Sequence, residues 1–470
     1  MSARSLSLAA AVFLASLPAA AEKQSPPPPA PAGAFRLPAT TEYTLPSGLK
    51  ITLVPFGDIP KVNVVLVFRA GNVDEPTGQG GLADVAGKLL LEGTTTRTAE
   101  QLAQAAAELG GNLEVAVTGD ESSLGIECLG EFAARAVALV AEVARHPALP
   151  DAELSRLKND LVRELALQRS RQQPLAAEAF ARAIYGPQHP YGRPIADPAE
   201  VKGLTLAEVK KFLATHLGAN RAHLYVVGRF DPAALKKPIE EAFSGWGKAP
   251  GGKPPPARTK AGRAVYFLDR AGAVQSTVVL GLPVVPPTSP DFIALTVTNT
   301  LLGGSFQSRI TANIREKRGY TYSPFSALTT HPGVGTWSEA ADVTTKDTAA
   351  AVQEVVNEVT ELRARPPGAD ELAGFQRYVS GTFVRVNGTR AGIILQLRFV
   401  ELYGLPPSWL STYVAKVTAV TPAEVNRVAK KYLDPGRMTL VVVGDQKTVA
   451  STLAPFGKVV FLSPPPSSTP

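Results

Sequence analysis

Cysteine and histidine, two residue types that commonly bind zinc, are scarce in this sequence. The single cysteine, Cys128, excludes an internal disulfide framework and any site built from several thiolates. No two histidines stand at the spacing with which a helix presents a pair of zinc ligands; the five are His146, His189, His216, His223 and His331. A Gly-x-Ser-x-Gly elbow is also missing, and no Cys/His pair is placed for catalysis. These residues argue against a serine or cysteine hydrolase and against a histidine-based metal site.

Two short segments place charged or polar side chains at spacings that matter for chemistry. Asp84 and Lys88 are four residues apart on an expected helix, which puts an acid beside a base. Farther along, Arg315 and Tyr322 are seven residues apart. A guanidinium can hold a carbonyl or carboxylate, and a phenol can donate a hydrogen bond to an oxyanion. On the residues alone, the favoured interpretation is that Arg315 belongs to a solvated charged run and that Tyr322 is a strand aromatic.

The elements that must position these residues follow from hydrophobic periodicity. Strands are expected over 48–55, 62–68, 113–118 and 123–129, and helices over 80–92, 98–109, 131–145 and 150–171. On the helix over 80–92, one face should enter the core; it consists of Leu82, Val85, Ala86 and Leu89. Gly87 costs this helix about 1 kcal/mol relative to Ala. Either something approaches the backbone there, or a larger side chain was lost without replacement.

The sequence is internally duplicated. Residues 205–228 align without gaps on residues 421–444, at an offset of 216, and ten of the 24 positions are identical. In each copy a Thr with Glu three residues later predicts a capped helix, and an apolar strand follows. The Gly- and Pro-rich segment 249–260 reads as a linker between the halves. We therefore expect an α+β protein of two duplicated halves, each an antiparallel-rich sheet with helices on one face.

Composition and the two ends of the chain indicate the class of protein and its division into segments. The 470 residues, 45% apolar and 19% charged, indicate a soluble globular protein of about two to four folding units. Arg4 and the apolar run 6–17 precede Ala19-Ala20-Ala21, a pattern typical of an export signal (1–21), so we expect a periplasmic or secreted product without a stable membrane anchor. We divide the rest of the chain into a Pro-rich leader (22–40), two halves (41–248 and 261–462) and a disordered tail (463–470). The net charge of +7 is dispersed and gives no indication of nucleic-acid binding.

Four segments resemble the pitrilysin/insulinase-like (inverzincin) metallopeptidases, in particular their processing-peptidase branch. They are residues 81–94 (GLADVAGKLLLEGT), 189–194 (HPYGRP), 302–306 (LGGSF) and 314–322 (IREKRGYTY). Each segment alone is weakly specific, but four in the right order across a duplicated chain form a strong match. The resemblance covers about residues 41–460.

The resemblance also implies that the zinc site of this chain is degenerate. In the family a helix carries His-x-x-Glu-His, with two imidazole ligands and a Glu that takes a proton from the metal-bound water. The matching positions here hold Asp84, Gly87 and Lys88, and the family's third ligand is matched by Glu164. We therefore expect no metal and no cofactor in this chain. An ion pair between Lys88 and Glu164, which Asp84 could join, should take the place of the ion.

For the second half, by contrast, the resemblance implies a retained functional segment. Some family members are heterodimers in which one subunit carries zinc and the other supplies an Arg and a Tyr. The resemblance assigns these roles to Arg315 and Tyr322, acting in a partner's site, and substrate binding to Gly303, Gly304, Phe306 and Arg309. It implies a non-catalytic subunit of an exported heterodimeric peptidase, with zinc in the partner and a peptide or unfolded protein as substrate. The alternative is a standalone peptide-binding or scaffold protein without activity.

Overall fold

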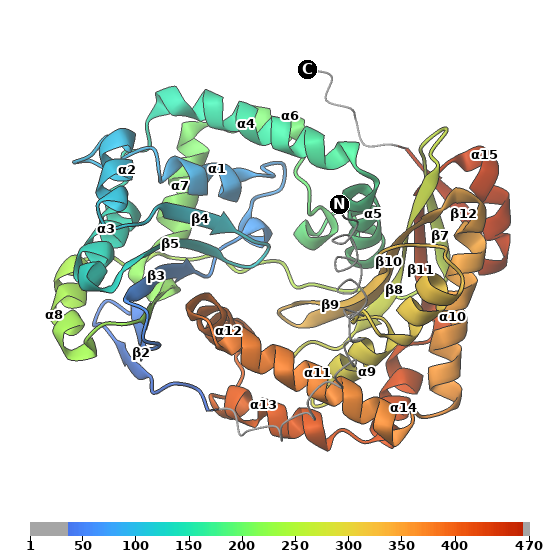
Figure 1. Cartoon of the computed structure of the whole chain (residues 1–470). Helices are drawn as coiled ribbons and strands as arrows, with labels where there is room; N and C mark the ends of the chain where they lie inside the picture. The colour runs from blue at the N-terminus through green and yellow to red at the C-terminus, as the bar shows by residue number, and fades with distance from the viewer. Residues whose placement is uncertain (1–35, 464–470) are drawn as a thin grey trace, which may run out of the picture. The chain divides into compact units, whose positions relative to one another are not determined.

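Each half of the chain is organised around its own six-stranded sheet (Figure 1). The computed structural model describes residues 36–463. The first sheet has the order β1-β2-β6-β3-β5-β4 and is built from Thr41–Thr44 (β1), Lys50–Pro55 (β2), Lys61–Phe68 (β3), Leu113–Val117 (β4), Ser122–Leu129 (β5) and Ala222–Gly228 (β6). Only β2 and β6 pair in parallel. The central strands β3 and β6 are rich in Val and Leu, as expected for strands covered on both faces.

The second sheet repeats this plan with the order β12-β7-β11-β8-β10-β9. Its strands are Ala264–Asp269 (β7), Gln275–Val284 (β8), Phe325–His331 (β9), Val334–Thr344 (β10), Thr439–Gly444 (β11) and Val459–Leu462 (β12). β11 lies parallel to β7 and antiparallel to β8, as β6 lies parallel to β2 and antiparallel to β3. The predicted α+β class with two related, mostly antiparallel sheets is therefore confirmed.

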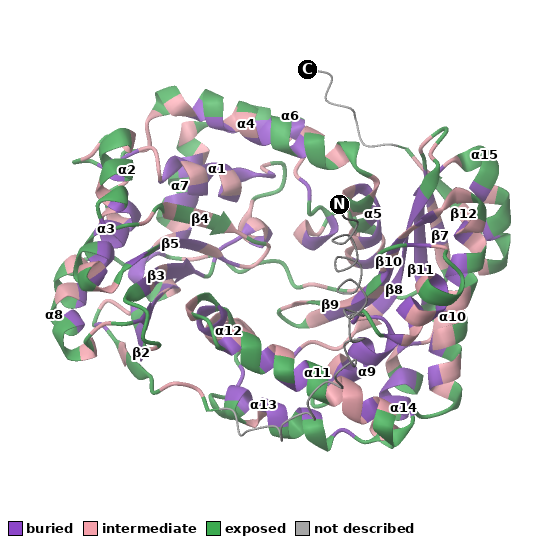
Figure 2. Ribbon diagram, in the orientation of Figure 1, coloured by how far each residue is buried: buried purple, intermediate pink, exposed green. Residues whose placement is uncertain are grey.

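Helices cover one face of each sheet and form the two main cores. Over the first sheet lie Leu82–Leu89 (α1), Ala133–Arg145 (α3), Leu206–His216 (α7) and Pro232–Ala242 (α8), with Ala99–Ala107 (α2) packed on α3. Over the second lie Phe292–Leu302 (α9), Thr348–Ala364 (α10), Ala369–Asn387 (α11), Ser408–Ala419 (α13) and Pro422–Tyr432 (α14). The predicted capping boxes of the duplicated segment are present at Thr205 and Thr421. In Figure 2 the strands are largely buried, whereas the outer sides of the helices are exposed.

The opposite face of each sheet receives a helix from the other half. Gln172–Tyr185 (α5), from the first half, packs Leu175 and Phe180 against β8 and β11. Arg390–Tyr403 (α12), from the second half, packs Ile393 and Ile394 against β2, β3 and β6. Each follows a long helix, Asp151–Ser170 (α4) or α11, so the two are equivalent elements of the duplication. The sequence predicted helices on one face only, because an apolar stripe does not reveal which sheet it will meet.

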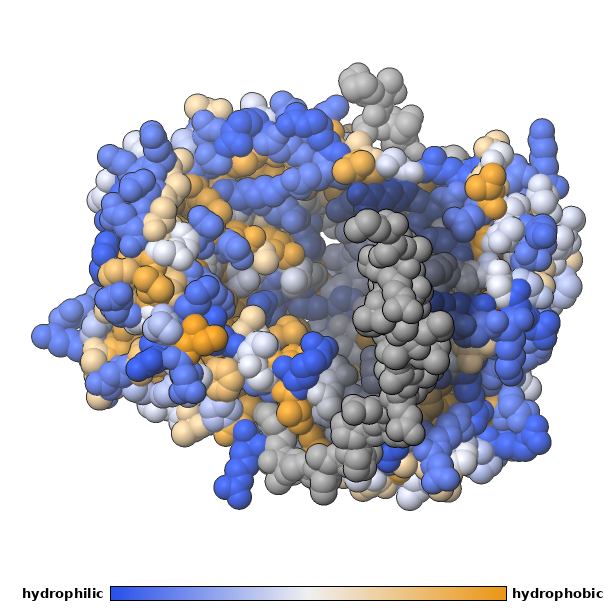
Figure 3. Space-filling model, viewed as in Figure 1, coloured by the Kyte–Doolittle hydropathy of each residue, from blue (hydrophilic) through white to orange (hydrophobic). Residues whose placement is uncertain are grey.

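The remaining sequence expectations concern the linker and the chain ends. Residues 246–263, which include the predicted linker, carry no helix or strand. The predicted signal peptide, most of the leader and nearly all of the tail lie outside the described residues. None of the helices within 36–463 has both the length and the apolar character needed to cross a bilayer. In the view of Figure 3, apolar residues on the surface occur in small groups among hydrophilic ones.

Candidate functional site

The helix that carries the predicted degenerate zinc site is α1. As predicted, Leu82, Val85, Ala86 and Leu89 are buried in the core. Lys88 Nζ lies 3.0 Å from Oε1 and 2.8 Å from Oε2 of Glu164 on α4. The predicted ion pair between Lys88 and Glu164 is therefore confirmed. The Lys88 and Glu164 side chains are 35% and 57% exposed, so the pair contributes at most about 1 kcal/mol to stability.

Asp84 does not share this ion pair. Its carboxylate accepts a hydrogen bond from Nδ2 of Asn72 at 2.8 Å, and burial raises its pKa. Beside it, the carboxylate of Glu75 accepts hydrogen bonds from the backbone N–H groups of Gly81 and Ala83 at the start of α1. Burial, together with the charge of the nearby Asp84, outweighs the hydrogen bonds that Glu75 accepts and raises its pKa to about 7. Asn72 and Glu75 were not among the predicted site residues, because they precede the helix and belong to no motif that we recognised.

The residues around α1 do not fit a zinc ion. Zinc sites in proteins use His, Cys and carboxylate ligands, whereas Lys88 places an ammonium at one ligand position and Gly87 offers no side chain at all. Glu164 is already bound by Lys88. Within residues 36–463, no group of three or more His, Cys, Asp or Glu side chains is arranged to hold a metal ion. We therefore assign no metal-dependent step to this half of the chain.

The structure explains Gly87 by close packing of the neighbouring edge strand. A Cβ on Gly87 would lie 2.8 Å from Cγ1 of Val115 and 3.2 Å from Cγ2 of Val117. Both valines project from β4, the edge strand of the first sheet. Of the two explanations open at the sequence level, close approach to the backbone is the one that the structure shows. The space beside α1 is occupied by valine methyl groups, which leaves no room for a carboxylate without rearrangement.

Arg315 and Tyr322 come together on the second half. Arg315 lies near the end of a short π-helix, Thr311–Lys317, and its guanidinium carbon is 4.8 Å from the centre of the Tyr322 ring. The guanidinium carbon of Arg315 is also 4.1 Å from the centre of the Phe306 ring. Both rings are largely exposed, at 65% for Phe306 and 79% for Tyr322. The structure thus brings three of the sequence-predicted residues into one exposed cluster.

The other predicted substrate-binding residues lie beneath or beside this cluster. Arg309 forms a bidentate ion pair with Glu371 on α11, with both N–O distances at 2.8 Å. Gly303 is buried, and a Cβ there would collide with Glu339 and Ser326. Gly304 leaves similar room for Asn299. In this structure Arg309, Gly303 and Gly304 support the segment that carries Phe306 and Arg315, and a direct contact of these three with substrate stays a prediction.

A third cluster, which no sequence motif predicted, joins the two halves. The hydroxyl of Tyr191 and Nδ1 of His331 both contact the carboxylate of Asp120, and the rings of Tyr191 and His331 stack with centres 3.8 Å apart. Asp120 lies at the turn between β4 and β5, and His331 at the turn between β9 and β10. Burial and the adjacent Asp120 raise the pKa of Tyr191. No local sequence signal links residues so far apart, and only the fold brings them into contact.

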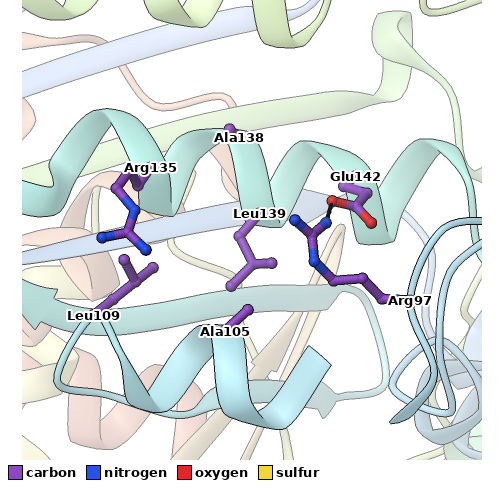
Figure 4. Close-up of a pocket in the computed structure, with 7 residues that line it drawn as sticks. All are labelled: Arg97, Ala105, Leu109, Arg135, Ala138, Leu139 and Glu142. Carbon is purple, nitrogen blue, oxygen red and sulfur yellow. Dashed lines mark hydrogen bonds and ion pairs between the residues drawn. The ribbon is translucent and has the colours of Figure 1, made fainter. Parts of the chain in front are cut away.

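A hollow between α2 and α3 is also visible on the first half (Figure 4). Its floor is small and apolar, and Arg97 and Arg135 stand at its two ends. Arg97 is paired with Glu142, and Arg135 lies 3.4 Å from Glu108. Arg135 also lies over the ring of Phe132, 5.2 Å from its centre. Since both cations already have acidic partners, this hollow has no free charge with which to bind an anion.

Two models of one protein family match successive parts of the chain. Residues 58–199, which include α1, match the family model described as insulinase (peptidase family M16), and residues 203–378, which include Arg315 and Tyr322, match the model of the peptidase M16 inactive domain. The chain belongs to peptidase family M16. The M16 models thus divide it into a peptidase part that contains α1 and an inactive-domain part that holds the aromatic cluster.

Relatives within the M16 family match most of the chain. An uncharacterized zinc protease of Mycobacterium bovis is 29% identical over 429 residues, which are 87% of this chain and 93% of that protein. One of Mycobacterium leprae is 30% identical over 61% of this chain and 65% of its own length. The crystal structure of a peptidase M16 inactive domain from Pseudomonas fluorescens superposes with a TM-score of 0.79 at 24% identity, covering 86% of this chain and 98% of that one.

Proposed function

We propose that this chain is a non-catalytic subunit of an exported heterodimeric zinc metallopeptidase and completes the active site of a homologous, zinc-bearing partner. One observation carries the proposal. The positions that the family resemblance assigns to zinc ligands on α1 and α4 hold the Lys88–Glu164 ion pair, whereas Arg315 contacts the exposed ring of Tyr322 on the second half. A chain that cannot hold the metal but displays groups suited to a peptide carbonyl is equipped to assist another subunit. Export rests on the signal-like sequence at residues 1–21.

The two side chains have distinct roles in this proposal. The Arg315 guanidinium, held between Phe306 and Tyr322, positions the substrate backbone through charge-assisted hydrogen bonds. The Tyr322 hydroxyl donates a hydrogen bond to the oxygen that becomes negative when water attacks the peptide carbonyl. Neither role requires Tyr322 to ionise or Arg315 to lose a proton. The partner supplies the zinc and the base, and this chain supplies only hydrogen-bond donors and positive charge.

The first prediction tests these roles in a complex with a homologous chain that carries His-x-x-Glu-His. Arg315→Ala and Tyr322→Phe should each lower kcat/KM for peptide hydrolysis by about 10²-fold, the usual scale for loss of one oxyanion donor. Association of the subunits, followed by gel filtration, should be unchanged. The isolated chain should cleave no peptide. Elemental analysis of the isolated chain should find no stoichiometric zinc.

A control is Arg135→Ala, which also removes an arginine that lies over an aromatic ring but is placed far from the cluster in the sequence. It should leave kcat/KM unchanged. If Arg315→Ala and Tyr322→Phe keep full activity in the complex, the shared-site mechanism is wrong, and the scaffold or peptide-binding alternative takes its place. About one zinc per isolated chain, lost on mutation of Glu164, would also contradict the proposal.

A further inference from the structure

The guanidinium of Arg315 differs from the other arginines of its segment in how it is held. Arg309 forms a bidentate ion pair with Glu371, and Arg318 is paired with Glu354 and donates to Asn313. Arg315 has one acidic neighbour, Glu316, whose Oε1 lies 3.1 Å from Nε. Among residues 36–463 no acceptor receives a hydrogen bond from Arg315, so the two terminal Nη groups have no partner there. The outer end of its donor fork is therefore available to a ligand.

The two aromatic rings fix the plane of this fork. Phe306 follows the Gly303-Gly304 turn after α9, and Tyr322 follows the π-helix, so the rings reach Arg315 from separate segments. Stacking on these rings attracts the guanidinium and restricts rotation of the Arg315 side chain. The Arg315 side chain is only 21% exposed, although both rings are largely open to solvent. A ligand that lies on the rings would meet the guanidinium edge, where the Nη donors are.

The charges around Arg315 favour a ligand with a single negative charge. Glu316 offsets part of the Arg315 charge, and the Arg318 charge is offset by Glu354. A phosphate or nucleic acid would be better served by several free cations, whereas one planar fork matches one carboxylate. The exposed rings of Phe306 and Tyr322 add apolar surface directly beside it. The site is thus shaped for an anion with an apolar neighbour.

We propose that Phe306, Arg315 and Tyr322 bind a peptide carboxylate that is followed or preceded by an apolar side chain. The carboxylate is either the C-terminus of a peptide or an Asp or Glu side chain, which present the same group to the fork. The inference deepens the proposed function, because it names the substrate class for the same cluster. It requires no zinc and no partner, so the isolated chain should show this binding by itself.

The experiment measures binding to the isolated full chain by isothermal titration calorimetry, with three N-acetylated hexapeptides. The first ends in Leu-Phe with a free carboxylate, the second is its C-terminal amide, and the third is an amide with Glu beside the Phe. The free acid should bind at least about 10-fold more tightly than the plain amide, since one charge-assisted contact is worth about 1.5–3 kcal/mol. If the Glu-containing amide binds as tightly, acidic side chains are recognised; if it does not, only the C-terminus is.

Variants connect this preference to the cluster. Arg315→Ala should abolish the preference for the acid, and Arg315→Lys should retain only part of it, because an ammonium cannot offer the planar fork. Tyr322→Phe should preserve the preference, since the ring remains, and the control Arg135→Ala should be indistinguishable from the unaltered chain. Equal binding of acid and both amides, or an undiminished preference in Arg315→Ala, would overturn the inference. The titrations do not measure hydrolysis. A negative result in the heterodimer assay would therefore not change the interpretation of the binding result.

Discussion

At the scale of single residues, Glu339 is an acidic side chain whose buried surroundings disfavour its charged form. It lies on β10, fully buried beneath the Gly303-Gly304 turn, and no side chain within the described residues donates a hydrogen bond to its carboxylate. Burial raises its pKa well above the ordinary value. The folded protein therefore holds Glu339 as the neutral acid over a pH range in which the unfolded chain has already released the proton.

The second prediction follows from this difference in protonation. Because the folded-state pKa of Glu339 is raised, its contribution to stability is fully present below the unfolded pKa of about 4.3 and is lost as pH rises toward the folded pKa. Glu339→Gln removes that loss, so it should raise the free energy of unfolding, and the gain should be larger at pH 8 than at pH 5. Denaturant titrations at the two pH values provide the measurement. Glu100→Gln on the exposed side of α2 serves as the control and should give no pH-dependent gain, and an equal gain at both pH values for Glu339→Gln would contradict the argument.

Some of the site residues could be predicted from the sequence, and others could not. The Lys88–Glu164 pair could be predicted, because both residues occupy positions that converge on one ion in the family. Arg315 and Tyr322 were found through the same family resemblance. The Phe306 ring on Arg315 and the Tyr191–Asp120–His331 cluster could be seen only in the structure. Contacts between distant loops depend on turn geometry and on packing of the halves, and neither leaves a local pattern in the sequence.

At the scale of elements, α1 shows how packing overrides local preference. A glycine inside a helix is unfavourable by about 1 kcal/mol relative to alanine, and α1 keeps one because β4 presses against it. The hydrophobic pattern predicted the helix and its buried face, but not that an edge strand would lie against its middle. Likewise, seven residues are too few for periodicity to distinguish the π-helix 311–317 from an α-helix.

The third prediction compares two helical glycines. At Gly374 in α11, a Cβ would have no other atom within 4 Å, so Gly374→Ala should raise the free energy of unfolding by about 0.5–1 kcal/mol. Gly87→Ala should give a smaller gain or a loss, because its methyl group meets Val115 and Val117. Chemical denaturation of both variants provides the comparison. If Gly87→Ala stabilised the protein as much as Gly374→Ala, β4 would not restrict α1 as described.

At the scale of the whole molecule, the exchange of α5 and α12 binds the halves to each other. Leu175 and Phe180 of α5 are buried on the second sheet, and Ile393 and Ile394 of α12 on the first. Each such side chain contributes about 1.5–3 kcal/mol on burial. Polar contacts add to them, such as the 3.2 Å ion pair of Arg398 on α12 with Glu121 in the first half. The linker is therefore one connection among several.

The fourth prediction is that cutting the linker will not separate the halves. A protease site introduced at the exposed residues 252–254 should allow complete cleavage, and the two fragments should still elute together from gel filtration under native conditions. Combining the cut with Phe180→Ala and Ile393→Ala should loosen the association, because each substitution leaves a cavity on the exchanged face. Separate elution of the fragments from the otherwise unaltered protein would show that the exchanged helices contribute little.

The exchange of α5 and α12 also indicates a route by which a chain with two equivalent halves can arise. A single half would lack a helix for the outer face of its own sheet and would project an equivalent helix with nothing to cover. Two copies would satisfy each other by trading that helix, which is the arrangement of a domain-swapped homodimer. Joining the copies through a segment like 249–260 turns that encounter between molecules into one within a molecule, independent of protein concentration. Once fused, the copies can diverge, and here one half carries the Lys88–Glu164 ion pair while the other carries an arginine that contacts two exposed aromatic rings.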